Sequence, residues 1–373
     1  MRFLFLTTGS HVTVYATAAL AKAVRNAGHE LLVATNEPLI DAVEGIGVPG
    51  VSIMPEPIRH FLTGVGSTDE MVVAGRGLAR MAAAATPTLR DLAEDWAPDV
   101  VLGSSMSYAA GLLATRLGVP FVRHAEYLQI PMAEIDPAAE EELAPQLKDL
   151  GLGGLPDPAM LIDVTPPSLG PSPSARAQPM GFVATNPQRR LERWMYTRPT
   201  DRPRVLITSG THHRMLAGSA LHHLVRQLTS AGAEVVIAAH AEVAAEFGAD
   251  TDDVRVGWIP LDVVVPTCDL TVHHGGATTA MTIMTAGVPQ LITPPNTHTR
   301  AIAGVLSAAG AARTIRSELP EGSHDLADAM AADSREILAD PRYSRRARAL
   351  AAEIAALPTP ADVVRRMESL VTG

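Results

Sequence analysis

The chain has 373 residues, 47% of them hydrophobic, and its 40 acidic and 30 basic residues give a formal net charge of −10. This length exceeds one typical hydrophobic core and predicts two domains. The negative charge, without a basic run, argues against nucleic acid or an anionic membrane as a partner. The single cysteine, Cys268, cannot form an internal disulfide and indicates a reducing compartment.

The N-terminal segment shows no targeting pattern. Its apolar stretch is too short for a secretory signal and lacks a small-residue cleavage site. No unbroken apolar run in the chain approaches the length of a transmembrane helix. We therefore expect a cytoplasmic protein.

The first half of the chain alternates buried strand patterns with amphipathic helix patterns. The strands are expected at residues 3–6, 31–34, 100–102 and 121–123, and the helices at 15–27 and 109–117. Strands joined through helices form an open, mostly parallel sheet. This half therefore predicts a doubly wound α/β domain.

The texture changes before the second half begins. Glycine and proline are dense from residue 151 to 187, which predicts irregular structure near a domain boundary. The alternation then restarts, with strands at 204–208 and 234–238 around a helix at 219–231, and the chain ends in helices 342–356 and 361–371. The boundaries predicted from this pattern are a domain over 1–190, a linker over 191–203, a second domain over 204–356 and a terminal helix within 357–373.

The segment that begins Asp269-Leu-Thr-Val-His-His-Gly-Gly-Ala-Thr-Thr combines a strand end, a glycine turn and a helix start. Gly275 and Gly276 allow a tight turn, so the first-turn amides around Ala277 and Thr278 point out of the helix. A helix N-terminus attracts anions, and His274 beside it can donate a further hydrogen bond. The segment predicts a phosphate site, and a glycine turn with a packed histidine is the alternative.

Other phosphate motifs are absent from the sequence. No Gly-x-Gly-x-x-Gly follows either opening strand, and no phosphate loop with Gly-Lys-Ser or Gly-Lys-Thr is present. These absences argue against a nicotinamide oxidoreductase and against a P-loop kinase. We expect no cofactor and no metal, so that helix amides, His274 and hydroxyls stabilise the leaving group.

Residues 269–294, together with Val256-Gly-Trp-Ile-Pro-Leu, resemble the nucleotide-sugar motif of the two-domain (GT-B) glycosyltransferases that decorate bacterial antibiotics. Residues 1–28 are similar to the opening strand, loop and helix of that family. Three further segments are similar to enzymes that glycosylate aromatic polyketides, above all the urdamycin-type C-glycosyltransferases. These segments are residues 57–61, 106–108 and 194–198. The resemblance implies an acceptor domain and a donor domain, each Rossmann-like, facing each other across a cleft, with the last helix returning to the first domain.

The resemblance also implies the reaction. An inverting transfer would move a deoxysugar from a nucleoside diphosphate, in this case thymidine diphosphate (TDP), to an aromatic polyketide aglycone, forming a C-glycosidic bond in antibiotic biosynthesis. An O-glycosyltransferase acting on a macrolide or phenolic hydroxyl is the first alternative. An inactive member that activates another transferase is the second, and a homodimer stays open.

Three segments of the second domain are candidates for donor binding. By resemblance Trp258 stacks on the nucleobase, and backbone groups near Ile259 and Leu261 read its edge. Hydroxyls and an amide from Ser209, Gly210 and Thr211 are expected to grip the diphosphate opposite His274. Residues 294–300 lack the Asp-Gln that family members using fully hydroxylated sugars often carry, which favours a deoxysugar within reach of Asn296 and His298. A core tryptophan and a simple capping turn are the alternatives.

The acceptor side needs a base. His11 follows the first strand, where family members often carry a catalytic histidine, and an imidazole can accept a phenolic proton near neutral pH. Glu126 is the rival base, since carboxylates in this loop serve the C-glycosylating relatives, and Glu134 and Asp136 are weaker candidates. An apolar acceptor pocket is expected, and core placement is the alternative for most of its members. These are Ser10, Ile58, His60, Phe61, Met81, Met106, Tyr108, Tyr127, Ile130 and Asp136.

Overall fold

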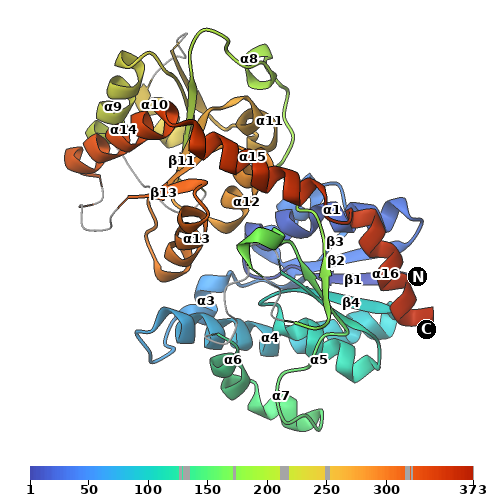
Figure 1. Ribbon diagram of the computed structural model, residues 1–373. Coiled ribbons are helices and arrows are strands. Elements are labelled where there is room, and N and C mark those ends of the chain that lie inside the picture. The colour runs from blue at the N-terminus through green and yellow to red at the C-terminus, as the bar shows by residue number, and fades with distance from the viewer. Residues whose placement is uncertain are drawn as a thin grey trace. The chain divides into compact units, whose positions relative to one another are not determined.

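The computed structural model describes residues 1–125, 128, 135–170, 174–210, 218–247, 253–315, 320 and 322–372. The chain divides into two compact units, each with its own parallel sheet (Figure 1). Unit 1 comprises Met1–Thr165, Gly170–Pro187 and Ala356–Gly373, and unit 2 comprises Pro166–Leu169 and Gln188–Ala355. Both units are doubly wound α/β folds, as the sequence predicted.

Unit 1 is built on a seven-stranded sheet in the order β3-β2-β1-β4-β5-β6-β7. The strands are β1 (Arg2–Leu6), β2 (Glu30–Asn36), β3 (Gly50–Met54), β4 (Val100–Ser104), β5 (Phe121–His124), β6 (Met160–Asp163) and β7 (Ala177–Pro179). Phe3 to Leu6 of β1 are fully buried, as expected for a central strand covered by helices on both faces.

The helices of unit 1 include both the first and the last of the chain. They are α1 (His11–Asn26), α2 (Ile40–Gly45), α3 (Ile58–Leu62), α4 (Glu70–Asp95), α5 (Tyr108–Leu117), α6 (Asp136–Glu142), α7 (Ala144–Asp149) and α16 (Pro360–Thr372). Helix α16 packs against α1, and Nε2 of His29 lies 2.6 Å from Oε1 of Glu368. The terminal helix therefore belongs to the fold of unit 1.

Two local expectations in unit 1 need correction. Helix α1 begins at His11 rather than at residue 15, because Ser10 already has the extended backbone of an N-cap. The glycine- and proline-rich region 151–187 is not wholly irregular, since it contains β6 and β7 at one side of the sheet. Strands of three or four residues at a sheet edge tolerate proline, which hides them from a periodicity search.

Unit 2 is built on a six-stranded parallel sheet in the order β10-β9-β8-β11-β12-β13. The strands are β8 (Arg204–Thr208), β9 (Glu234–Ala238), β10 (Val254–Gly257), β11 (Leu270–His273), β12 (Gln290–Ile292) and β13 (Ala312–Thr314). The helices are α8 (Arg193–Tyr196), α9 (Gly218–Ser230), α10 (Ala241–Phe247), α11 (Leu261–Val264), α12 (Ala277–Thr285), α13 (Thr297–Ala308), α14 (His324–Ala339) and α15 (Pro341–Ala355). Helix α9 packs on α14, and α12 packs on α15.

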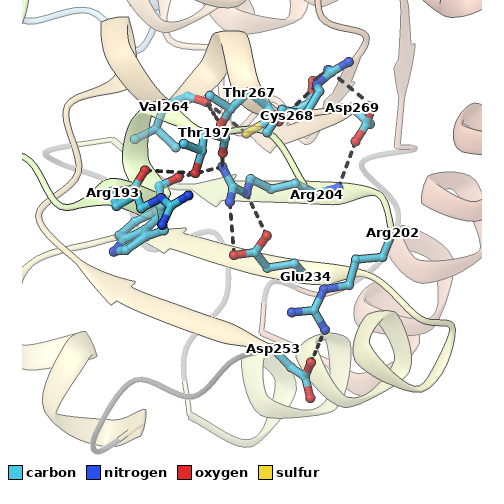
Figure 2. Close-up of polar contacts among 12 residues, drawn as sticks. Arg193, Thr197, Arg202, Arg204, Glu234, Asp253, Val264, Thr267, Cys268 and Asp269 are labelled. Carbon is cyan, nitrogen blue, oxygen red and sulfur yellow. Dashed lines mark hydrogen bonds and ion pairs between the residues drawn. The ribbon is translucent and has the colours of Figure 1, made fainter. Parts of the chain in front are cut away.

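A buried charge cluster closes the amino edge of the unit 2 sheet. Arg204 and Glu234, the first residues of β8 and β9, are 2% and 4% exposed and form two hydrogen bonds of 2.9 and 3.2 Å (Figure 2). Arg204 also donates to the carbonyl oxygens of Trp194 and Thr197 and to the hydroxyl of Thr267. Residues 194–197 are thereby fixed to unit 2. Within the described residues, no helix is long and apolar enough to cross a membrane.

Candidate active site

The strand order of unit 2 brings three loops together at the carboxyl edge of its sheet. The register aligns Thr208 of β8 and Ile292 of β12 with His273 of β11 between them. The chain leaves β8 toward β9 on one side and later returns through β11 on the other, so the topology switches between β8 and β11. Open α/β sheets bind ligands at such a point. The loops after β8, β11 and β12 carry most of the predicted donor residues.

The imidazole of His274 lies against two glycines of these loops. A Cβ atom added to Gly210 would come 2.5 Å from Cε1 of His274, and one added to Gly276 would come 2.3 Å from Nε2. Gly210 also has a φ of +71°, which disfavours any side chain there. The structure thus brings together His274, Gly210 and Gly276, three residues predicted for one diphosphate site.

His273 was not predicted as a site residue. Its side chain stabilises the glycine turn at Gly275 through hydrogen bonds. It is fully buried, and its Nδ1 accepts a hydrogen bond of 3.1 Å from the N–H of Gly275. Its Nε2 lies 2.9 Å from Oε1 of Gln290, whose amide nitrogen donates to the carbonyl of Ala280 in α12. Burial lowers the pKa of His273 to about 3, so the ring is neutral, with its proton on Nε2 facing the Gln290 oxygen.

This arrangement changes the expected roles of the turn amides. The N–H of Gly275 is directed inward to His273 and is not available to a phosphate. In the described part of the chain, the N–H groups of Gly276, Ala277 and Thr278 make no hydrogen bond. These amides at the start of α12, which lie beside His274, can donate hydrogen bonds to an anion. We call the hydrogen bonds of His273 to Gly275 and Gln290 the His273–Gln290 brace. Its clues in the sequence were the doubled histidine and the glutamine that opens β12.

The loop after β12 holds the residues expected near the sugar. Oδ1 of Asn296 accepts a hydrogen bond of 2.9 Å from the N–H of Thr299, and Oγ1 of Thr299 accepts one of 3.2 Å from the N–H of Asn296, which forms a capping box for α13. His298 lies in the first turn of α13, and burial lowers the pKa of its imidazole. The amide oxygen of Asn296 therefore serves the helix, and sugar binding by either residue stays a prediction.

The predicted nucleobase segment follows β10 at the same edge of the sheet. Trp258 is partly buried, and the guanidinium carbon of Arg189 lies 4.2 Å from the centre of its ring. Ile259 is 6% exposed and packs with Val264 and other apolar residues, so only its backbone is placed to read a base. Leu261 begins α11.

Unit 1 has a corresponding switch point between β1 and β4. Gly9, with a φ of +105°, and Ser10 follow β1, and His11 begins α1 with its ring 6.1 Å from that of Tyr15. A chain of hydroxyls continues from this loop, because Oγ of Ser107 lies 3.2 Å from Thr8 Oγ1 and 2.6 Å from Ser104 Oγ. His11 is thus held at the edge where a doubly wound domain binds its ligand.

Asp136 is engaged in an ion pair and is poorly suited to act as a base. Its carboxylate accepts hydrogen bonds of 3.0 and 3.1 Å from the two terminal nitrogens of Arg123 and one of 2.9 Å from the hydroxyl of Tyr108. The guanidinium and the tyrosine hydroxyl thus engage both carboxylate oxygens, which places Asp136 in a structural ion pair.

Several expected acceptor residues lie in the core of unit 1. Phe61, Met81 and Tyr108 are 9%, 1% and 7% exposed and belong to one apolar cluster, so the core alternative describes their positions. His60 is exposed, whereas Ser10, Met106 and Ile58 are partly buried. Glu126, Tyr127, Ile130, Glu134 and Thr211 lie outside the described residues. The described ranges contain no group of three metal-ligating side chains.

Comparison with known proteins decides the family. Residues 60–210 and 222–370 match the N-terminal and C-terminal domains described as "Erythromycin biosynthesis protein CIII-like". The chain is 36% identical over 352 residues to the L-demethylnoviosyl transferase of Streptomyces niveus, covering 92% of this chain and 91% of that protein. The chain belongs to the antibiotic glycosyltransferases. Its resemblance to that family, first seen in the donor motif, is confirmed.

Solved structures place this glycosyltransferase in the GT-B fold. The glycosyltransferase SsfS6 of Streptomyces sp. SF2575, complexed with thymidine diphosphate, matches with a TM-score of 0.84 and 33% identity over 99% of each chain. The spinosyn rhamnosyltransferase SpnG, complexed with spinosyn aglycone, matches with a TM-score of 0.86 and 29% identity over 99% of this chain and 100% of its own. The fold class predicted from the sequence is confirmed.

Proposed function

We propose that this glycosyltransferase moves a deoxysugar from TDP to a phenolic polyketide aglycone in antibiotic biosynthesis, with inversion and without a metal. The observation that carries the proposal is the packing of His274 against Gly210 and Gly276 at the start of α12. The absence of the Asp-Gln pair from residues 294–300 favours the deoxysugar. The TDP complex of SsfS6 supports the nucleotide.

The proposed reaction is a single displacement. His11 accepts the proton of the acceptor phenol, and the phenolate oxygen, or the ring carbon beside it, forms a bond to the anomeric carbon of the sugar. The bond from that carbon to the diphosphate oxygen breaks, and TDP departs with the electron pair. When the ring carbon attacks, it then loses its proton and the oxygen regains one, which restores the aromatic phenol. The amides of Gly276, Ala277 and Thr278, with His274, stabilise the negative charge that develops on the leaving diphosphate.

The bond formed is the finer part of the proposal. Attack by carbon follows from the resemblance of residues 57–61, 106–108 and 194–198 to C-glycosyltransferases. Attack by oxygen needs no change in the donor site. Mass spectrometry and NMR of products formed from a TDP-deoxysugar and a panel of phenolic polyketides separate the two, because a C-glycoside survives acid and an O-glycoside is hydrolysed.

The expected result is a glycosylated phenol with stoichiometric release of TDP, at a rate that a metal chelator leaves unchanged. His11→Ala is expected to lower the rate by about 10²-fold, and Glu126→Gln tests the rival base. TDP binding with no transfer to any phenol would overturn the proposed acceptor class. Loss of activity with chelator would overturn the metal-free mechanism.

A further inference from the structure

The nucleobase segment of unit 2 has a neighbour that the donor motif does not include. Residues 188 and 189 lie far upstream in the sequence, yet both contact the segment after β10. The guanidinium carbon of Arg189 lies 4.2 Å from the ring centre of Trp258, and the amide nitrogen of Gln188 donates a hydrogen bond of 2.9 Å to the carboxylate of Asp262. Two independent contacts therefore hold residues 188 and 189 against Trp258 and α11.

The Arg189 guanidinium covers one face of the Trp258 indole. A flat ring has two faces, and a cation within about 6 Å of the centroid occupies one of them. The segment that follows Trp258 is fixed in the fold. Ile259 is 6% exposed, and the fully buried Val264 donates its N–H to the carbonyl of Pro260. Gln188 anchors the backbone that carries Arg189. The Arg189 side chain is exposed, and its guanidinium lies over the indole of Trp258.

We propose that Arg189 is a positioning residue for the nucleobase: it backs one face of Trp258, so that the pyrimidine of the donor stacks on the other. This role rests on the proposed donor function of Trp258. A backed indole needs less ordering when the base binds, which raises affinity without a direct contact between Arg189 and the nucleotide. The chemical class recognised is the pyrimidine nucleoside of the donor.

The test measures TDP affinity by calorimetry in wild type and in variants of Arg189, Arg190 and Trp258. Arg189→Ala is expected to weaken binding about 3- to 30-fold, and Arg189→Lys to retain most of the affinity, because a cation over the ring remains. Arg190→Ala, which removes a neighbouring exposed arginine, is the matched control and should bind like wild type. In the transfer reaction, Arg189→Ala should raise KM for the donor and leave kcat nearly unchanged.

A double-mutant cycle identifies the route of the effect. If Arg189 acts through the indole, Arg189→Ala causes no further loss in a Trp258→Ala background. The same loss in both backgrounds would mean that Arg189 contacts the diphosphate, and would overturn the proposal. Tighter binding by Arg189→Ala would mean that the base displaces the guanidinium, and unchanged binding that the contact is incidental; either overturns it.

The failure of this role and the failure of the proposed function give different results. Wild-type protein that binds TDP and transfers sugar, together with an Arg189→Ala variant that binds equally well, removes only the role of Arg189. Wild-type protein that binds no TDP removes the proposed donor and, with it, this role.

Discussion

The two edges of the unit 2 sheet hold their polar groups in opposite ways. At the amino edge, Arg204 and Glu234 are buried and bonded to each other, and Arg204 also bonds to neighbouring carbonyls (Figure 2). At the carboxyl edge, the imidazole of His274 lies against two glycines, and the amides of Gly276 to Thr278 make no hydrogen bond in the part of the chain described. Bonded polar groups stabilise the fold at the first edge, whereas unbonded amides make the second edge suited to bind a ligand.

The largest expected effect is on the stability of the amino edge. Arg204→Met leaves the carboxylate of Glu234 buried without its partner, which is expected to lower the free energy of unfolding by about 3–5 kcal/mol. Urea unfolding measures this. The control is Arg202→Met, which removes a pair to the exposed Asp253 and should cost under about 1 kcal/mol. TDP affinity of the folded Arg204→Met protein should match wild type; a selective loss of TDP binding would contradict the division between the edges.

The next effect is on ligand binding at the carboxyl edge. The new Cβ of Gly276→Ala would lie 2.3 Å from Nε2 of His274, so the ring must move and its hydrogen bond to a phosphate is lost. We expect TDP affinity to fall about 10- to 100-fold by calorimetry, the value for a charge-assisted hydrogen bond. Gly304→Ala in α13, where an added Cβ meets nothing within 4 Å, is the control. Equal affinities in the two variants would refute the packing of His274 as a functional constraint.

The sequence predicted the alternation of both units because their central strands are continuous apolar runs, such as Phe3 to Leu6, between amphipathic helices. The prediction of an anion site rests on paired glycines before a helix, which are a local signal. The sequence could not predict the Arg204–Glu234 pair or the Arg189–Trp258 contact, because each joins residues far apart in the chain. The doubled histidine and Gln290 were a clue to the His273–Gln290 hydrogen bond, but only the pairing of β11 with β12 brings these two side chains together.

A smaller, pH-dependent effect comes from buried histidines in the two units. Burial lowers the pKa of His124 to about 4 and that of His273 to about 3, against 6.5 in the unfolded chain. The unfolded state then binds more protons below pH 6.5, so stability falls as the pH drops from 6.5 toward these values. The expected slope is up to ~1.4 kcal/mol per pH unit for each histidine.

Urea unfolding at pH 7, 6 and 5 (about one unit apart across the start of that window) measures the slope. His124→Leu should flatten it by the share of one histidine. A stability that is constant from pH 7 to 5 would show that these rings are not held neutral in the folded protein.

The smallest effect is expected from the brace beneath the turn. Gln290→Leu removes the acceptor for Nε2–H of His273, which loosens the hold on the N–H of Gly275. Unfolding free energy should fall by about 1–2 kcal/mol, with a few-fold loss of TDP affinity. Gln178→Leu in unit 1 is the control for TDP binding. A loss of stability with unchanged TDP affinity would show that the brace stabilises the fold and does not contribute to TDP binding.

We infer that the carboxyl edge of unit 2 binds the diphosphate of the donor. Calorimetry with TDP and with thymidine, on wild type and His274→Ala, separates binding of the diphosphate from binding of the nucleoside. We expect wild type to bind TDP more tightly than thymidine, and His274→Ala to lose about 10-fold or more for TDP and little for thymidine. Equal affinity of wild type for the two ligands, or an unchanged TDP affinity in His274→Ala, would contradict it.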